Sequence, residues 1–171
     1  NTNVYLIKEI KKFGLGADVV SVGELMMAIK AGISPKKIVF SGVGKTFDEI
    51  KFAINKKIFL INAESESEIK QIEKIAKLKK KKIKIGIRLN PNTDAKTLSQ
   101  ISTGKKENKF GVNSKTFIRI INNYKNSKNI ELKCLSVHIG SQILDHKPYE
   151  KMLNSISKIL EKIKYKFEFI D

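Results

Sequence analysis

Ile38-Val39-Phe40-Ser41-Gly42-Val43-Gly44-Lys45-Thr46-Phe47-Asp48-Glu49 contains one complete strand, loop and helix start. The first three residues form a short apolar run, which is typical of a buried strand. Two glycines follow and predict a loop. The Thr46-x-x-Glu49 pattern is a capping box that starts a helix, and the apolar residues from Ile50 to Ile54 continue it with helical spacing.

The same unit is repeated on both sides of this stretch. Further strands are expected at residues 17–21, 58–62, 83–89, 132–137 and 167–171. Helices are expected at residues 3–13, 114–124 and 149–163. A further helix at 24–30 is opened by a Ser21-x-x-Glu24 capping box, and a long helix begins at a Ser65-x-x-Glu68 box. The strands are short apolar runs without alternation, as in a parallel sheet buried on both faces. The alternation of strands and helices along the chain predicts an α/β protein, with either an open doubly wound sheet or a closed barrel.

Polar and small residues gather near and after the carboxyl ends of the expected strands. They are Asp18, Gly42, Gly44, Glu64, Arg88, Asn90, His138 and Ser141. In a barrel all strand ends converge on one mouth, whereas in an open sheet they spread along an edge. The dinucleotide-binding pattern Gly-x-Gly-x-x-Gly does not follow the first strand, because Gly14-Leu15-Gly16 precedes a strand and does not open a helix. This arrangement favours the barrel.

Ser136-Val137-His138-Ile139-Gly140-Ser141-Gln142 is the expected centre of the functional site. It leads from an apolar strand into a loop of small residues. An aromatic nitrogen base beside backbone N–H groups and a hydroxyl that can face an anion suits a planar phosphorylated cofactor. The alternative is a core histidine at a strand end whose hydrogen bonds are satisfied by its neighbours. The heptapeptide alone does not decide between the two.

Composition indicates one globular domain, since 41% of the 171 residues are hydrophobic and only 3 are proline. The single cysteine, Cys134, has no partner for an intramolecular disulfide, which favours a reducing, cytoplasmic setting. No apolar run reaches membrane-spanning length and no signal-peptide pattern is present, so a soluble protein is expected. The first residue is Asn1 and not Met, which suggests a fragment.

The net charge of +17 raises the question of nucleic-acid binding. The charge is carried almost entirely by lysine, since Arg88 and Arg119 are the only arginines. The densest cluster, Lys79 to Lys82, lies where a solvated loop is expected, and no aromatic residues are interleaved for base stacking. An AT-rich coding bias explains this composition more simply, and neither a nucleic acid nor a membrane is the expected partner.

Five stretches together resemble diaminopimelate decarboxylases. In chain order they are Gly16 to Ser21 with Gly23-Glu24-Leu25, Ile38 to Thr46, Arg88-Leu89-Asn90-Pro91, Ile101-Ser102-Thr103-Gly104 with Lys106 to Gly111, and His138-Ile139-Gly140-Ser141-Gln142. The resemblance covers essentially the whole chain. The wider family consists of pyridoxal phosphate (PLP) enzymes with an alanine-racemase-like barrel and includes ornithine and arginine decarboxylases. Residues 94–111 are most similar to the diaminopimelate branch.

The resemblance implies a partial TIM (β/α)8 barrel of the alanine-racemase-like type, comprising about strands 2 to 7. Residues 1–171 would form a single incomplete PLP-binding domain, with the first strand and a C-terminal β domain absent. The lysine that forms the Schiff base with the cofactor ends that first strand, so no catalytic residue is assigned within the chain. No metal is implied. The family forms homodimers, and Lys109 is expected near the dimer interface.

The resemblance also implies roles for the residues of the site. His138 would stack on the pyridine ring, and Ser141, next to Gly140, would hydrogen-bond the phosphate. Asp18 would lie close to the Schiff-base lysine, and Arg88 would face the phenolate side of the ring. Alternatives remain: a capping or loop role for Asp18, and a structural ion pair for Arg88.

The implied activity is the PLP-dependent decarboxylation of meso-2,6-diaminopimelate to L-lysine, in lysine biosynthesis, by the full-length parent. The 171 residues alone are expected neither to catalyse nor to fold stably. A related decarboxylase of the ornithine or arginine type is one alternative, and a non-catalytic PLP-binding barrel is another. A lysine-rich RNA-binding module represents a third class of function.

Overall fold

The computed structural model describes residues 3–92 and 110–171. Within these ranges six strands form one parallel sheet in the order β1-β2-β3-β4-β5-β6. They are β1 (Ala17–Val19), β2 (Ile38–Phe40), β3 (Leu60–Ala63), β4 (Ile83–Arg88), β5 (Ile130–Ser136) and β6 (Phe169–Ile170). Each strand pairs with the next one along the chain and the order never reverses. This is the connectivity of a barrel and not that of a doubly wound sheet.

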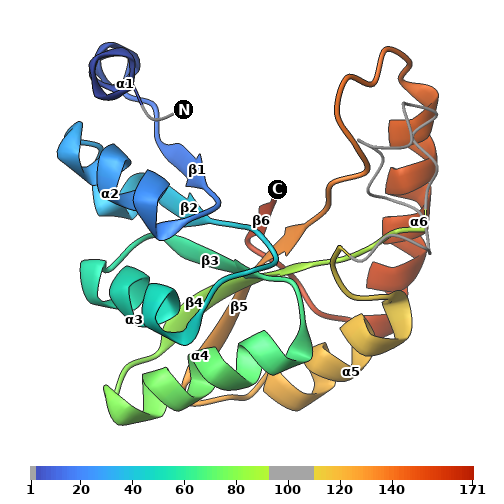
Figure 1. Cartoon of the computed structure of the whole chain (residues 1–171). Helices are drawn as coiled ribbons and strands as arrows, with labels where there is room; N and C mark the ends of the chain where they lie inside the picture. The colour runs from blue at the N-terminus through green and yellow to red at the C-terminus, as the bar shows by residue number, and fades with distance from the viewer. Residues whose placement is uncertain (1–2, 93–109) are drawn as a thin grey trace.

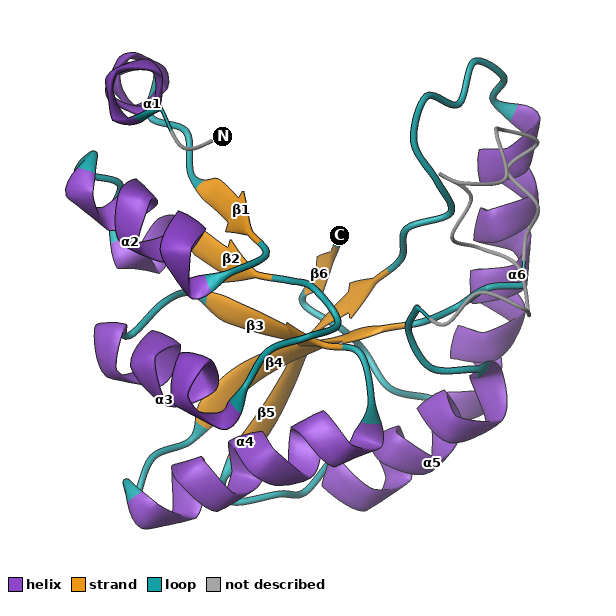
Figure 2. Cartoon of the chain, in the orientation of Figure 1, coloured by secondary structure: helices purple, strands orange, loops and turns teal. Residues whose placement is uncertain are grey.

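The helices alternate with the strands, as the sequence predicts (Figure 2). They are α1 (Val4–Lys12), α2 (Val22–Lys30), α3 (Phe47–Lys56), α4 (Glu66–Leu78), α5 (Ser114–Tyr124) and α6 (Lys147–Ile163), with a short 3-10 helix, η1, at Pro35–Lys37. Helices α2 to α5 follow one another along the outer side of the curved sheet (Figure 1). None of the helices within the described ranges is long and apolar enough to cross a membrane.

The sheet is strongly curled. Strands β3 and β6 are separated by two other strands, so in a flat sheet they would lie about 14 Å apart, three strand spacings. The rings of Phe59, before β3, and Phe169, in β6, nevertheless meet edge to face with centroids 5.2 Å apart. At the other end of the same strands, Asn62 Nδ2 donates to Asp171 Oδ2 at 2.8 Å. The chain therefore forms a half-barrel, which confirms the predicted partial barrel.

Glutamates hold the turns between strands and helices. At α3 the predicted capping box is complete, because Thr46 N–H donates to Glu49 and Glu49 N–H donates to the Thr46 hydroxyl. At α2 and α4 the capping serine accepts as expected, but the glutamate accepts from the residue before the cap. These bonds run from Val20 N–H to Glu24 at 2.8 Å and from Glu64 N–H to Glu68 at 2.9 Å. The two glutamates thereby fix the ends of the preceding strands.

The core lies between the sheet and the helices. The apolar face of α4, formed by Ile69, Ile72, Ile75 and Ala76, is fully buried. The apolar stripe of α6 is less covered: Ile156 is buried, whereas Met152, Ile159 and Ile163 are partly exposed and pack at the edge of the core.

Gly86, in β4, is required by close packing. A Cβ atom built there would lie 2.0 Å from Asn62 Oδ1 and 3.1 Å from the Cβ of Cys134. Substitution Gly86→Ala is therefore expected to lower the free energy of unfolding by roughly 1–3 kcal/mol, the usual cost of overpacking a core. Gly44→Ala is the control, because a Cβ at Gly44 meets nothing within 4 Å. Urea unfolding of both variants, made in the full-length parent, tests this, and a Gly86→Ala protein as stable as the Gly44→Ala protein would contradict it.

Candidate active site

A cavity of about 530 Å³ opens at the carboxyl ends of the strands. Polar residues from six different strand ends line it: Asp18, Ser41, Asn62, Arg88, His138 and Asp171. Its volume is in the range of small-molecule sites, which are typically about 300–1,000 Å³. The predicted convergence of strand ends on one mouth is what creates it.

Three of the five predicted cofactor residues meet in this cavity: Asp18, Arg88 and His138. The other two, Gly140 and Ser141, follow His138 in the chain but are not among the described residues that line the cavity. Gly140 is buried and Ser141 is exposed. Their predicted contact with a phosphate stays a prediction. Lys109 lies outside the described residues.

Asp18 belongs to a hydrogen-bonded network along the floor of the cavity. The Ser41 hydroxyl donates to Asp18 Oδ1 at 2.8 Å, and Asn62 Nδ2 donates to Ser41 Oγ at 3.2 Å. The same Asn62 nitrogen donates to Asp171 Oδ2 at 2.8 Å, and the Ser136 hydroxyl donates to that oxygen at 2.9 Å. Asp18 thus contacts a neighbouring strand end within the site.

Burial raises the pKa of the Asp18 carboxyl, and the nearby negative charges of Asp171 and Glu24 raise it further. The Ser41 hydrogen bond and the positive charge of Lys45 act in the opposite direction. Asp18 consequently holds a proton at a higher pH than an exposed aspartate does, a property common among residues of functional sites.

Arg88 is both an ion-pair partner and a lining residue. Its guanidinium donates to Glu64 Oε1 at 2.8 Å, and the two side chains are only 13% and 4% exposed. Glu64 Oε2 also accepts from Gly111 N–H at 3.2 Å, and the guanidinium lies 5.1 Å from the centroid of the Phe110 ring. The structural ion pair considered for Arg88 is therefore present, and it fixes the guanidinium at the cavity.

His138 is exposed at the mouth of the cavity and is not a core residue. Desolvation of the ring, together with the positive charge of Arg88, lowers its pKa below the ordinary value. The neutral imidazole therefore predominates at neutral pH. An uncharged flat ring at the edge of a cavity is suited to stacking on another flat ring.

Lys45 and Glu68 form a buried ion pair that was not predicted. Their nitrogen and oxygen are 2.9 Å apart, and the side chains are 1% and 9% exposed. The Lys45 ammonium also donates to the carbonyl of Gly42 and lies 5.6 Å from the centroid of the Phe40 ring. The pair joins the loop after β2 to the start of α4, next to the cavity.

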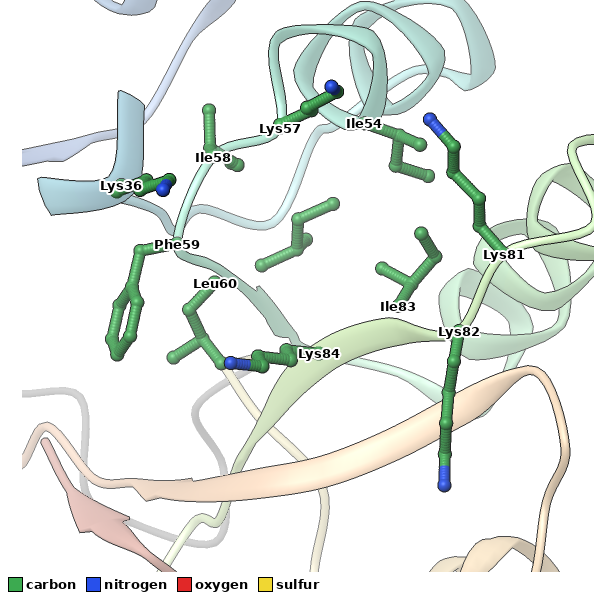
Figure 3. Close-up of a pocket in the computed structure, with 11 residues that line it drawn as sticks. Lys36, Ile54, Lys57, Ile58, Phe59, Leu60, Lys81, Lys82, Ile83 and Lys84 are labelled. Carbon is green, nitrogen blue, oxygen red and sulfur yellow. The ribbon is translucent and has the colours of Figure 1, made fainter. Parts of the chain in front are cut away.

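A second hollow, of about 690 Å³, lies at the opposite ends of β3 and β4 (Figure 3). Its rim carries Lys36, Lys57, Lys81, Lys82 and Lys84, all exposed. We call it the lysine hollow. The described residues around it include no carboxylate, imidazole or hydroxyl, and Lys82 points away from its centre in Figure 3. Sites in α/β barrels form at the carboxyl ends of the strands, so the cavity around His138 is the candidate.

Lys45→Met tests the buried pair. Without its partner, Glu68 is left as a buried charge, which typically costs about 3–5 kcal/mol of unfolding free energy. Burial already raises the pKa of Glu68. A group with a raised folded-state pKa stabilises the fold below its unfolded pKa and loses that contribution as the pH rises.

The loss of unfolding free energy in Lys45→Met is therefore expected to be larger at about pH 8 than at about pH 5, measured by urea unfolding of the full-length parent. The double variant Lys45→Met/Glu68→Gln removes the charge but keeps an acceptor for Glu64 N–H, and should recover most of the stability. Equal stability of Lys45→Met and the unmodified protein at both pH values would contradict the prediction.

Comparisons with known proteins agree with this geometry. Residues 1–170 match the family described as pyridoxal-dependent decarboxylase, pyridoxal binding domain. The chain is 45% identical over 163 residues to diaminopimelate decarboxylase of Helicobacter pylori (strain J99), covering 95% of this chain and 40% of that protein. It is 40% identical over 166 residues to the diaminopimelate decarboxylase of Aquifex aeolicus, covering 97% of this chain and 40% of the relative.

A solved structure of a diaminopimelate decarboxylase is also similar to this chain. The crystal structure of diaminopimelate decarboxylase from Helicobacter pylori complexed with L-lysine superposes with a TM-score of 0.95 at 43% identity, covering 100% of this chain and 44% of that one. The chain spans about 40% of the length of the curated relatives it matches. Because this family match extends over nearly its whole length, the chain belongs to the pyridoxal-dependent decarboxylases and corresponds to their pyridoxal-binding domain.

Proposed function

We propose that this chain is the cofactor-binding barrel of a diaminopimelate decarboxylase, a lyase that uses PLP to convert meso-2,6-diaminopimelate to L-lysine. The observation that carries the proposal is the cavity in which Asp18, Arg88 and His138 meet from three strands. Relatives at 40% and 45% identity bear the name diaminopimelate decarboxylase, and the Helicobacter pylori enzyme was crystallised as a complex with L-lysine.

The residues of the cavity fit PLP. The volume of about 530 Å³ is sufficient for a small planar cofactor together with an amino acid. The rim carries an exposed imidazole held neutral at neutral pH, which is the form that stacks on a pyridine ring. A guanidinium fixed by its ion pair and a carboxylate of raised pKa face the same space.

His138 would hold the ring by stacking, and Arg88 would face its phenolate oxygen. Gly140 and Ser141 would bind the phosphate, and Asp18 would lie beside the amine that is linked to the cofactor. Bound PLP supplies an electron sink that stabilises negative charge on the substrate α-carbon as carbon dioxide leaves. No lysine in the described part of the chain lines the cavity, so the 171 residues alone are not expected to catalyse.

Turnover by the full-length enzyme tests the substrate. We expect carbon dioxide release from meso-2,6-diaminopimelate and little from ornithine or arginine, measured with equal amounts of PLP-loaded enzyme. Faster turnover of ornithine or arginine would assign the protein to a different branch. No turnover of any of the three, with PLP bound, would favour a non-catalytic PLP-binding barrel.

His138→Ala in the same enzyme should weaken PLP binding about tenfold, which corresponds to the free energy of one aromatic stacking contact. Activity should fall, while the fold is kept. His146→Ala is the matched control, because His146 is exposed at the start of α6 and does not line the cavity. Cofactor absorbance titrations measure both variants. Equal PLP affinity of the two would show that His138 does not contact the cofactor.

We also propose a homodimer that works in the reducing cytoplasm. The described cysteine, Cys134, is free and buried, and burial raises its pKa to about 12, so the thiol is unreactive.

For the dimer, Lys109→Glu should shift the full-length protein toward monomer and lower activity, since a charge reversal at a paired interface is repulsive. Lys80→Glu, on an exposed turn, makes the same charge change as a control. Sedimentation of Lys109→Glu as an intact dimer at low concentration would contradict this.

A further inference from the structure

We propose that Asn62 is a positioning residue for Asp18: its side-chain amide acts through Ser41 to hold the Asp18 carboxylate in the cavity and to connect it to Asp171. The inference rests on the proposed function, because it concerns the carboxylate that would lie beside the cofactor. It adds a residue that the sequence does not single out, and it assigns that residue a task distinct from packing.

Asn62 sits where it can reach both sides of the half-barrel. It is 1% exposed and lies in β3, between the loop after β2 and the end of β6. Its Nδ2 donates to Ser41 Oγ at 3.2 Å and to Asp171 Oδ2 at 2.8 Å. Ser41 then donates to Asp18 Oδ1 at 2.8 Å. One amide nitrogen therefore links the carboxyl ends of three strands.

The direction of these hydrogen bonds requires an amide at position 62. Ionised carboxylates only accept, and a serine hydroxyl has a single hydrogen. Ser41 gives its hydrogen to Asp18 and accepts from Asn62. Asn62 thus supplies one N–H to Ser41 and the other to the Asp171 carboxylate. An aspartate of the same shape would supply neither.

The orientation of the amide is fixed by its surroundings. Asn62 Oδ1 lies against Gly86, at whose position a Cβ would be only 2.0 Å away. A flipped amide would turn this oxygen toward the Asp171 carboxylate, acceptor against acceptor. Within the described ranges Asn62 Oδ1 is buried without a hydrogen-bond partner. Such an atom usually costs about 1–3 kcal/mol, so packing alone does not account for an asparagine here.

The hydrogen bonds from Asn62 through Ser41 affect the protonation state of Asp18. Desolvation and the charges of Asp171 and Glu24 favour its protonated form, whereas the Ser41 hydrogen bond and Lys45 favour the carboxylate. The charge of Asp18 is in turn felt by His138 across the cavity. If Ser41 loses its donor or changes its direction, the balance at Asp18 moves toward the protonated form.

Asn62→Asp in the full-length enzyme is the direct test. It keeps the shape of the side chain against Gly86 but removes both donors and adds a negative charge. We expect the Asp18 carboxyl to titrate at a higher pH, followed by ¹³C NMR of aspartate-labelled protein and assigned with Asp18→Asn. The acidic limb of the pH–activity profile should move in the same direction, and kcat should fall roughly tenfold or more.

Ser41→Ala and Ser136→Ala form a matched pair, since each removes one hydroxyl from the network. Ser41 contacts Asp18 directly, whereas Ser136 contacts only the Asp171 end. Ser41→Ala should reproduce the shift of the Asp18 titration, and Ser136→Ala should shift it less. Asn62→Ala removes the same two donors as Asn62→Asp without adding a charge, and should also move the Asp18 titration to higher pH. It keeps the proposal testable if Asn62→Asp does not fold.

Unchanged titration of Asp18 in Asn62→Ala, or equal shifts in the two serine variants, would overturn the proposal. The NMR measurement needs no substrate. An enzyme that shows the Asp18 shifts but does not decarboxylate diaminopimelate would therefore contradict the proposed function while supporting the role of Asn62.

Discussion

The curl of the parallel sheet is the constraint on which the site depends. In a flat sheet, β3 and β6 would lie about 14 Å apart. Curling brings Phe59 onto Phe169 at one end and Asn62 within 2.8 Å of Asp171 at the other. Because all strands are parallel, the residues that end them then face one space. The amphipathic helices on the outside bury their apolar faces against the sheet.

The loops at the mouth are held by four charged side chains, which form two largely buried ion pairs. Lys45 contacts Glu68, Glu68 accepts from the backbone of Glu64, and the Glu64 side chain pairs with Arg88. Buried ion pairs add little net stability, because desolvation offsets their attraction. Their effect here is geometric, since this series of contacts ties the loops after β2, β3 and β4 to one another. Side chains that are fixed by contacts within the chain reduce the cost of ordering a site on binding.

Much of the fold could be predicted from local patterns. The bounds of β2 and α5 were predicted as observed, and so were the capping residues at three helix starts, because caps and apolar spacing act over a few residues. Asp18, Arg88 and His138 could be picked out because they lie in or just after the carboxyl ends of strands, and all three line the cavity. Asn62 was missed, because its importance comes from the curl, which no local pattern encodes. Lys45 was missed because, in a chain so rich in lysine, nothing in the sequence distinguishes a buried lysine from its exposed neighbours.

A crystal structure of the full-length enzyme with PLP would test the central claim most directly. The account predicts the pyridine ring against His138, in the cavity lined by Asp18, Asn62 and Arg88 at the carboxyl ends of the strands. An anionic cofactor also has an electrostatic alternative in the lysine hollow at the opposite ends of β3 and β4. Electron density for PLP in the lysine hollow, or a covalent link to Lys57, Lys81 or Lys84, would contradict the account.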